Sequence, residues 1–195
     1  MDWFEHWALS LGVFIPLAGA AVMMFVPRAN EEMHKVIALV TSLLTMAVGV
    51  YLVAKFDYTT SKLQFVTNHK WIDVINSRYQ IGIDGISLPL LILSMFIVVL
   101  TIVYSWNHFP EPHNPKAFLI LTLILEVGMN GTFVAQDLIL FFVFFEIVLL
   151  PMYFMIGVWG GEQRLYAAIK FFLFTLFGSA LMILKIGRAS CRERV

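Results

Sequence analysis

Residues 137–154 read DLILFFVFFEIVLLPMYF, and this stretch decides the fold class. Apart from one carboxylate, Glu146, every residue from 138 to 154 is apolar, aromatic or proline. A strand of a membrane barrel alternates apolar and polar residues, and this stretch does not. A helix satisfies its own backbone polar groups, as a lipid environment requires. The stretch therefore predicts a membrane-spanning helix.

The composition extends this prediction to the whole chain. Of its 195 residues, 60% are hydrophobic and 13% are charged, whereas soluble domains average about 45–50% apolar and about 25% charged residues. A bilayer is crossed by about 20 mainly apolar residues, and six runs suit that length: 7–26, 36–53, 86–104, 117–134, 138–159 and 165–184. The first run follows an acidic start, which favours a retained helix over a signal peptide. We predict an all-α polytopic membrane protein with six transmembrane helices.

The same composition excludes several classes of function. The formal net charge is zero, so the basic surface of a nucleic-acid-binding protein is missing. One cysteine cannot build a thiolate metal site or an iron–sulfur centre. The five histidines lie at span ends or in loops, where they cannot serve as inward-facing haem ligands. No glycine-rich phosphate-binding motif is present. We therefore expect no cofactor, no metal and no nucleic acid on this chain.

The last residues differ in character from the rest. Residues 185–195 read KIGRASCRERV and follow the sixth apolar run. One interpretation is a basic tail that binds anionic lipid. The alternative, which we favour, is that residues 186–195 are a reading-frame translation of DNA that resembles a widely used short-read sequencing adapter. Such a segment is set aside before the fold is considered.

Glu146 is the strongest functional candidate in the sequence. It lies nine residues after Asp137, or about 13 Å along a helix, and thus near the middle of a hydrocarbon core about 30 Å thick. Ionisable side chains at that depth are costly and usually functional. The proton affinity of a buried carboxyl depends on whether a cation is close, so Glu146 is predicted to load and release a proton. A structural glutamate that is hydrogen-bonded across helices is the alternative.

Three further residues could support that role. Pro151 frees a backbone carbonyl one turn before it, and water at that carbonyl would provide a proton route; an ordinary packing kink is the alternative. Lys170 is the candidate cation if it points inward rather than snorkelling to the interface. Glu126 is a second carboxyl near mid-depth, either in a secondary proton path or satisfying a neighbouring helix. Gly128 and Gly131 beside it allow close helix approach.

Four motifs in order carry a resemblance to a known family. They are residues 81–87 (IGIDGIS), 128–133 (GMNGTF), 137–154, and 166–172 (YAAIKFF) with Thr175, Gly178 and Ser179. Together they resemble the antiporter-like membrane subunits, and among these the M (chain 4) family of proton-pumping NADH-quinone oxidoreductase, respiratory complex I. The resemblance covers residues 1–184.

The family implies a fold of about fourteen helices with two inverted five-helix repeats. Residues 1–116 would then hold the amino-terminal helices and loops, residues 117–184 the first three helices of the first repeat, and residues 185–195 the added tail. Glu146 is implied to pair with a lysine of a seventh helix beyond residue 184, and Lys170 matches the sixth-helix lysine. Short-loop Lys and Arg residues are balanced between the two sides and leave the orientation open. The resemblance implies a periplasmic N-terminus and an inner (plasma) membrane location.

The resemblance also implies the function and the partners. A Glu146/Lys170 relay would couple quinone reduction to proton pumping, with Glu126 as a secondary path. Flavin, iron–sulfur clusters and quinone would belong to other subunits, and the partners would be neighbouring membrane subunits and the lipid bilayer. Two alternatives remain: a sodium/proton antiporter or membrane-bound hydrogenase subunit of the same family, and a non-transporting scaffold bundle.

Overall fold

The computed structural model describes residues 3–28, 30–60, 62–72, 77–109 and 114–192. Six helices in this part of the chain are long and apolar enough to cross a membrane. They are α1 (Trp3–Phe25), α2 (Glu31–Lys55), α3 (Ser87–Tyr104), α4 (Pro115–Val134), α5 (Leu138–Trp159) and α6 (Arg164–Arg192). The predicted helical membrane fold is confirmed.

Local sequence determines where α4 and α5 begin. The side chain of Asn114 accepts a hydrogen bond from the backbone N–H of Ala117, and Pro115 occupies the first turn of α4, which are favourable choices at a helix start. Asp137 caps α5 by accepting from Ile139 and Leu140. At the other end of the chain, α6 continues past its apolar span, Arg164–Lys185, to Arg192. The sequence changes from apolar to basic and polar after residue 184, but α6 does not break there.

A β-hairpin that we did not predict connects α2 to α3. Its strands β1 (Gln64–Ile72) and β2 (Ser77–Ile83) pair antiparallel. The hairpin is attached to the chain between α4 and α5, where Ile81 pairs with Ala135 and the backbone N–H of Gln136 donates to Gln80 O at 2.9 Å. The hairpin thus contacts the residues that lead into α5.

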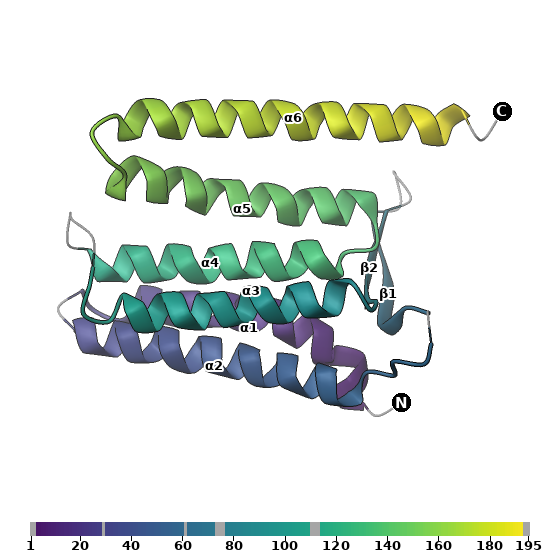
Figure 1. The fold of residues 1–195 in the computed structure, drawn as a ribbon, viewed down its shortest axis with the longest axis horizontal. Helices are drawn as coiled ribbons and strands as arrows, with labels where there is room; N and C mark the ends of the chain where they lie inside the picture. Colours follow the sequence, from purple (N-terminus) through teal and green to yellow (C-terminus); the bar gives the residue numbers. More distant parts are fainter. Residues whose placement is uncertain (1–2, 29, 61, 73–76, 110–113, 193–195) are drawn as a thin grey trace.

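The helices form a four-helix cluster with two further layers (Figure 1). Helices α1 to α4 pack on one another, α5 packs on α4, and α6 packs on α5. Figure 1 shows the hairpin at the end of the bundle where α5 begins. The order α4, α5, α6 gives α5 two packed faces, and one of them carries Glu146.

Buried polar residues interrupt the apolar core of the four-helix cluster. One apolar group includes Leu9, Leu52 and Met95, and the other includes Met23 and Leu123. Buried polar side chains of α2, α3 and α4 lie between or beside these groups: Ser42, Thr45, Ser94, Glu126 and Asn130. The core therefore holds a polar layer at mid-bundle, and this layer has to satisfy its own hydrogen bonds.

Candidate functional site

Glu146 contacts α6 through a hydrogen bond from Ser179. Ser179 Oγ lies 2.5 Å from Glu146 Oε1 and also 3.0 Å from the carbonyl oxygen of Leu176. Ser179 is buried, whereas Glu146 is half-buried between apolar neighbours. The carboxyl group is thus held at the α5–α6 interface by a hydroxyl group.

The opposite face of α5 is closed by tight packing on α4. A Cβ atom added at Gly128 would lie 2.6 Å from Val148 Cγ2 and 3.0 Å from Val148 N, and one at Gly131 would overlap the Phe144 ring. Glu146 is two residues from both Val148 and Phe144, which is a rotation of about 200° on a helix. Glu146 therefore points away from α4.

Glu126 lies in a separate environment within the four-helix cluster. It is completely buried, and neither carboxyl oxygen has a hydrogen-bond partner among the residues that the structure describes. Gly128 faces α5 and is about 200° around α4 from Glu126. Asn130, one turn after Glu126, contacts α3 at Ser94 Oγ (2.8 Å) and α1 at Gly12 O (3.2 Å). Glu126 thus faces α1 and α3, and the α4–α5 interface separates it from Glu146.

Lys170 is not brought to Glu146. Its side chain is exposed, and its Nζ lies 5.6 Å from the centroid of the Tyr166 ring. It precedes Ser179 by nine residues, which is about 13 Å and half a rotation of an α-helix. No Lys170–Glu146 ion pair occurs among the described residues. Lys170 and Ser179, the α6 residue that is bonded to Glu146, therefore lie on different faces and at different depths of α6.

Pro151 does not interrupt α5. The helix runs from Leu138 to Trp159 with Pro151 inside it and buried. The structure thus retains one continuous helix on both sides of the position where proline removes a backbone donor.

Asp137 connects the hairpin to the helix that carries Glu146. Its Oδ1 accepts from Ile139 N at 2.9 Å, Leu140 N at 3.1 Å and Ser77 Oγ at 3.1 Å, and its Oδ2 accepts from Arg78 N at 3.3 Å. Burial opposes ionisation of this carboxyl, but these hydrogen bonds outweigh it and lower the pKa of Asp137 below its ordinary value. One ionised carboxylate therefore holds both the start of α5 and β2.

Replacing Asp137 by alanine is expected to destabilise the first turn of α5 and the attachment of β2 to it. Loss of an N-cap costs about 1 kcal/mol, and hydrogen exchange should quicken at the amides of β2 and of the first turn of α5. The pKa of Asp137 is lower in the folded than in the unfolded chain. The stabilisation by its carboxylate is therefore complete above the pKa of the unfolded chain, about 3.9, and is lost as the pH falls through the pKa of the folded chain. Asp57→Ala is the control, since the Asp57 side chain accepts hydrogen bonds from Thr59 and Thr60 of its own turn. Unchanged exchange in Asp137→Ala would refute the connection.

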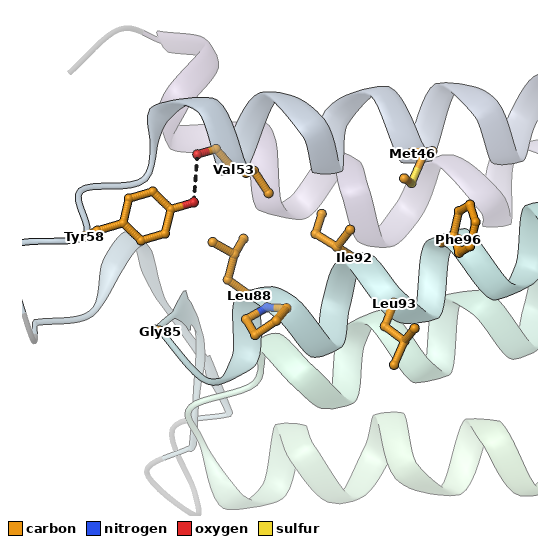
Figure 2. Close-up of a pocket in the computed structure, with 9 residues that line it drawn as sticks. Met46, Val53, Tyr58, Gly85, Leu88, Ile92, Leu93 and Phe96 are labelled. Atoms are coloured by element: carbon orange, nitrogen blue, oxygen red, sulfur yellow. Dashed lines mark hydrogen bonds between the residues drawn. The ribbon is translucent and has the colours of Figure 1, made fainter.

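An apolar groove lies between α2 and α3 (Figure 2). It has a volume of 540 Å³, and its lining includes Met46 and Val53 of α2 and Ile92 and Phe96 of α3. At one end the Tyr58 hydroxyl donates to Val53 O at 3.4 Å. Among the described residues, no Asp, Glu, Lys, Arg or His side chain lines the groove.

The described part of the chain also contains no cluster of three His, Cys, Asp or Glu side chains that could hold a metal ion. The residue whose role the sequence did not indicate is Ser179. It occurs in one of the quoted family segments, but a single hydroxyl in an apolar helix gives no periodic signal, and its partner depends on how α5 and α6 pack.

Two family profiles match the chain. Residues 11–132, more than half of the chain, match "NADH-ubiquinone oxidoreductase chain 4, amino terminus". Residues 135–187 match "NADH:quinone oxidoreductase/Mrp antiporter, TM". A similar relative is NADH-quinone oxidoreductase subunit M of Rhodobacter capsulatus, which is 42% identical over 179 residues. That match covers 90% of this chain and 34% of the relative, so the chain spans about a third of the length of the relative.

Solved structures show the same helical arrangement. A chain of respiratory complex I from Thermus thermophilus with bound NADH has a TM-score of 0.74 and 27% identity, over 90% of this chain and 34% of that one. A chain of the Mrp complex from Dietzia sp. DQ12-45-1b has a TM-score of 0.71 over 92% of this chain and 20% of that one, and at 17% identity it supports the fold alone. On the strength of the match over residues 11–132, the chain belongs to the NADH-ubiquinone oxidoreductase chain 4 family, which includes the bacterial M subunits.

Proposed function

We propose that the full-length subunit translocates protons within an NADH-quinone oxidoreductase of the inner (plasma) membrane, and that Glu146 is its proton-loading group. This proposal rests on the position of the Glu146 carboxyl group, which lies inside an apolar span and accepts a hydrogen bond from Ser179 of the next helix. An ionisable group at that depth is costly unless it functions or is paired. The redox cofactors are proposed to lie on partner subunits.

The mechanism we propose is electrostatic. Glu146 binds a proton when a cationic partner moves away and releases it when the partner returns. Two unit charges 4 Å apart interact by about 4 kcal/mol at an effective dielectric constant of 20, and each 1.36 kcal/mol changes a proton affinity by one pKa unit. The distance between Lys170 and Ser179 along α6 argues that this partner is another cation of the intact subunit, and that Lys170 acts at a different step of the relay.

Glu126 is proposed to serve a separate path. Its face of α4 is directed at α1 and α3, and the α4–α5 packing lies between it and Glu146. An unpartnered charge is costly in such a core, so we propose that Glu126 carries a proton in this arrangement and does not exchange it directly with Glu146.

Proton transport by the intact complex tests the function. Everted membrane vesicles from cells that express the full-length subunit are supplied with NADH, and interior acidification is followed with a fluorescent dye. We expect acidification that is lost when the gene is deleted and restored when it is returned. Proton transport that requires a sodium gradient and does not depend on NADH would instead indicate an antiporter. Acidification that persists without the subunit would exclude a proton-translocating role.

A further inference from the structure

The contacts of Ser179 point to a specific role for its hydroxyl group. The oxygen lies within hydrogen-bond distance of two acceptors, Glu146 Oε1 at 2.5 Å and Leu176 O at 3.0 Å. A serine hydroxyl has one proton to donate and two lone pairs to accept with. It can therefore donate to only one of these two oxygens at a time, and which one depends on the protonation state of Glu146.

We propose that Ser179 is a positioning residue that holds Glu146 in both protonation states by switching its hydroxyl proton between Glu146 Oε1 and Leu176 O. This inference rests on the proposed proton-loading role of Glu146. In the carboxylate state, Ser179 donates to Oε1. In the protonated state, the Glu146 hydroxyl donates to Ser179 Oγ, and Ser179 donates to Leu176 O.

The proton balance of the exchange is simple. A hydronium ion arriving from the aqueous side loses one O–H bond and leaves as water, while one O–H bond forms on the Glu146 carboxylate. The serine then rotates about its Cβ–Oγ torsion, and no other covalent bond changes. Proton release reverses these steps, with water accepting the proton.

A hydroxyl group suits this task better than other partners. A backbone N–H or a lysine only donates and so favours the carboxylate, whereas a carbonyl only accepts and so favours the acid. A hydroxyl group can bond Glu146 Oε1 in both states, so neither state leaves Oε1 or Ser179 Oγ without a hydrogen-bond partner, which would be costly. The switch thus preserves the α5–α6 contact at Glu146 while the proton enters and leaves.

The surroundings leave room for this exchange. A pocket of 320 Å³ lies at the α5–α6 interface, with Phe141 and Phe145 on one side and Thr175, Gly178 and Ser179 on the other. Thr175 lies one turn earlier, but its hydroxyl donates to Phe171 O at 2.8 Å and provides a matched control.

Three variants of the full-length subunit in its assembled complex test the proposal. Ser179→Ala should lower the rate of NADH-driven proton transport about tenfold, the scale expected for one hydrogen bond to a charged group. Ser179→Thr keeps a hydroxyl and should restore most of the rate. Thr175→Val removes a hydroxyl from the same surface and should pump normally.

A spectroscopic readout separates positioning from packing. In infrared difference spectra, the C=O stretching band of protonated Glu146 should move to higher wavenumber in Ser179→Ala and stay in place in Ser179→Thr and Thr175→Val. An unmoved band and an unchanged pumping rate in Ser179→Ala would overturn the switch. If Glu146→Gln abolishes pumping in the same experiment, only the switch fails; if Glu146→Gln pumps normally, the proposed function itself fails.

Discussion

Replacing Glu146 by glutamine in the full-length subunit is expected to abolish NADH-driven proton transport. Glutamine is nearly isosteric, and its side-chain oxygen can still accept the hydrogen bond from Ser179, so the α5–α6 contact is retained. It cannot bind and release a proton at physiological pH. The measurement is acidification of everted vesicles per NADH oxidised, which should fall to the level of vesicles that lack the subunit.

Two matched variants make this result interpretable. Glu162→Gln introduces the same chemical change at an exposed residue of the α5–α6 loop and should leave transport unchanged. Glu146→Asp keeps a titratable carboxyl but withdraws it from Ser179 and should retain partial transport. A scaffold bundle with a purely structural Glu146 predicts normal transport in Glu146→Gln, and that outcome would exclude the proton-loading role.

Replacing Gly128 by alanine is expected to prevent normal accumulation of the subunit in the membrane. The added Cβ would meet Val148 Cγ2 at 2.6 Å, Val148 N at 3.0 Å and Phe144 O at 3.2 Å. Two of these atoms belong to the backbone of α5, so α4 and α5 would have to separate. Overpacking of this kind costs about 1–3 kcal/mol, which exceeds the helix propensity of about 1 kcal/mol that alanine gains over glycine.

Gly157→Ala is the control for this prediction. Gly157 lies inside α5, and among the described residues its added Cβ would meet only Ala168 Cβ at 3.6 Å, an ordinary contact. This variant should accumulate at least as well as the parent chain. Quantitative immunoblotting of membranes and thermal unfolding in detergent compare the two. Equal stability of the two variants would show that α4 and α5 do not pack closely at Gly128.

The membrane-spanning helices could be predicted because hydropathy alone defines them. The predicted run 138–159 coincides with α5, and the prediction of 86–104 differs from α3 by one residue. The ends of α2 lie further out than predicted, because Glu31 and Lys55 are polar residues that a helix accommodates at its termini. Polar ends of this kind carry no hydropathy signal.

The sequence analysis does not predict the hairpin, because the apolar alternation of its strands is short. Tyr79, Ile81 and Ile83 do alternate along β2, which is the period of a strand, and this signal was available. The attachment of the hairpin to Asp137 and Ala135 could not be read from the sequence, because it joins segments more than fifty residues apart.

Sequence analysis predicts Glu146, the central residue of the site, but not the residues that contact it. Glu146 stands out by its depth in an apolar run, and so does Glu126. That these two carboxyl groups face different neighbours follows from Gly128, Phe144 and Val148, which define the α4–α5 interface only once the helices are packed. The separation of Lys170 from Ser179 likewise follows once the contact between Ser179 and Glu146 is known.

The most direct test of the central claim is the protonation change of Glu146 during turnover. Infrared difference spectra of membranes containing the intact complex, recorded with and without NADH, report buried carboxyl groups that gain or lose a proton. We predict a carboxyl C=O band that responds to NADH in the parent protein and in Glu162→Gln and is missing in Glu146→Gln. A band of full size in Glu146→Gln would contradict the assignment of Glu146 as the proton-loading group.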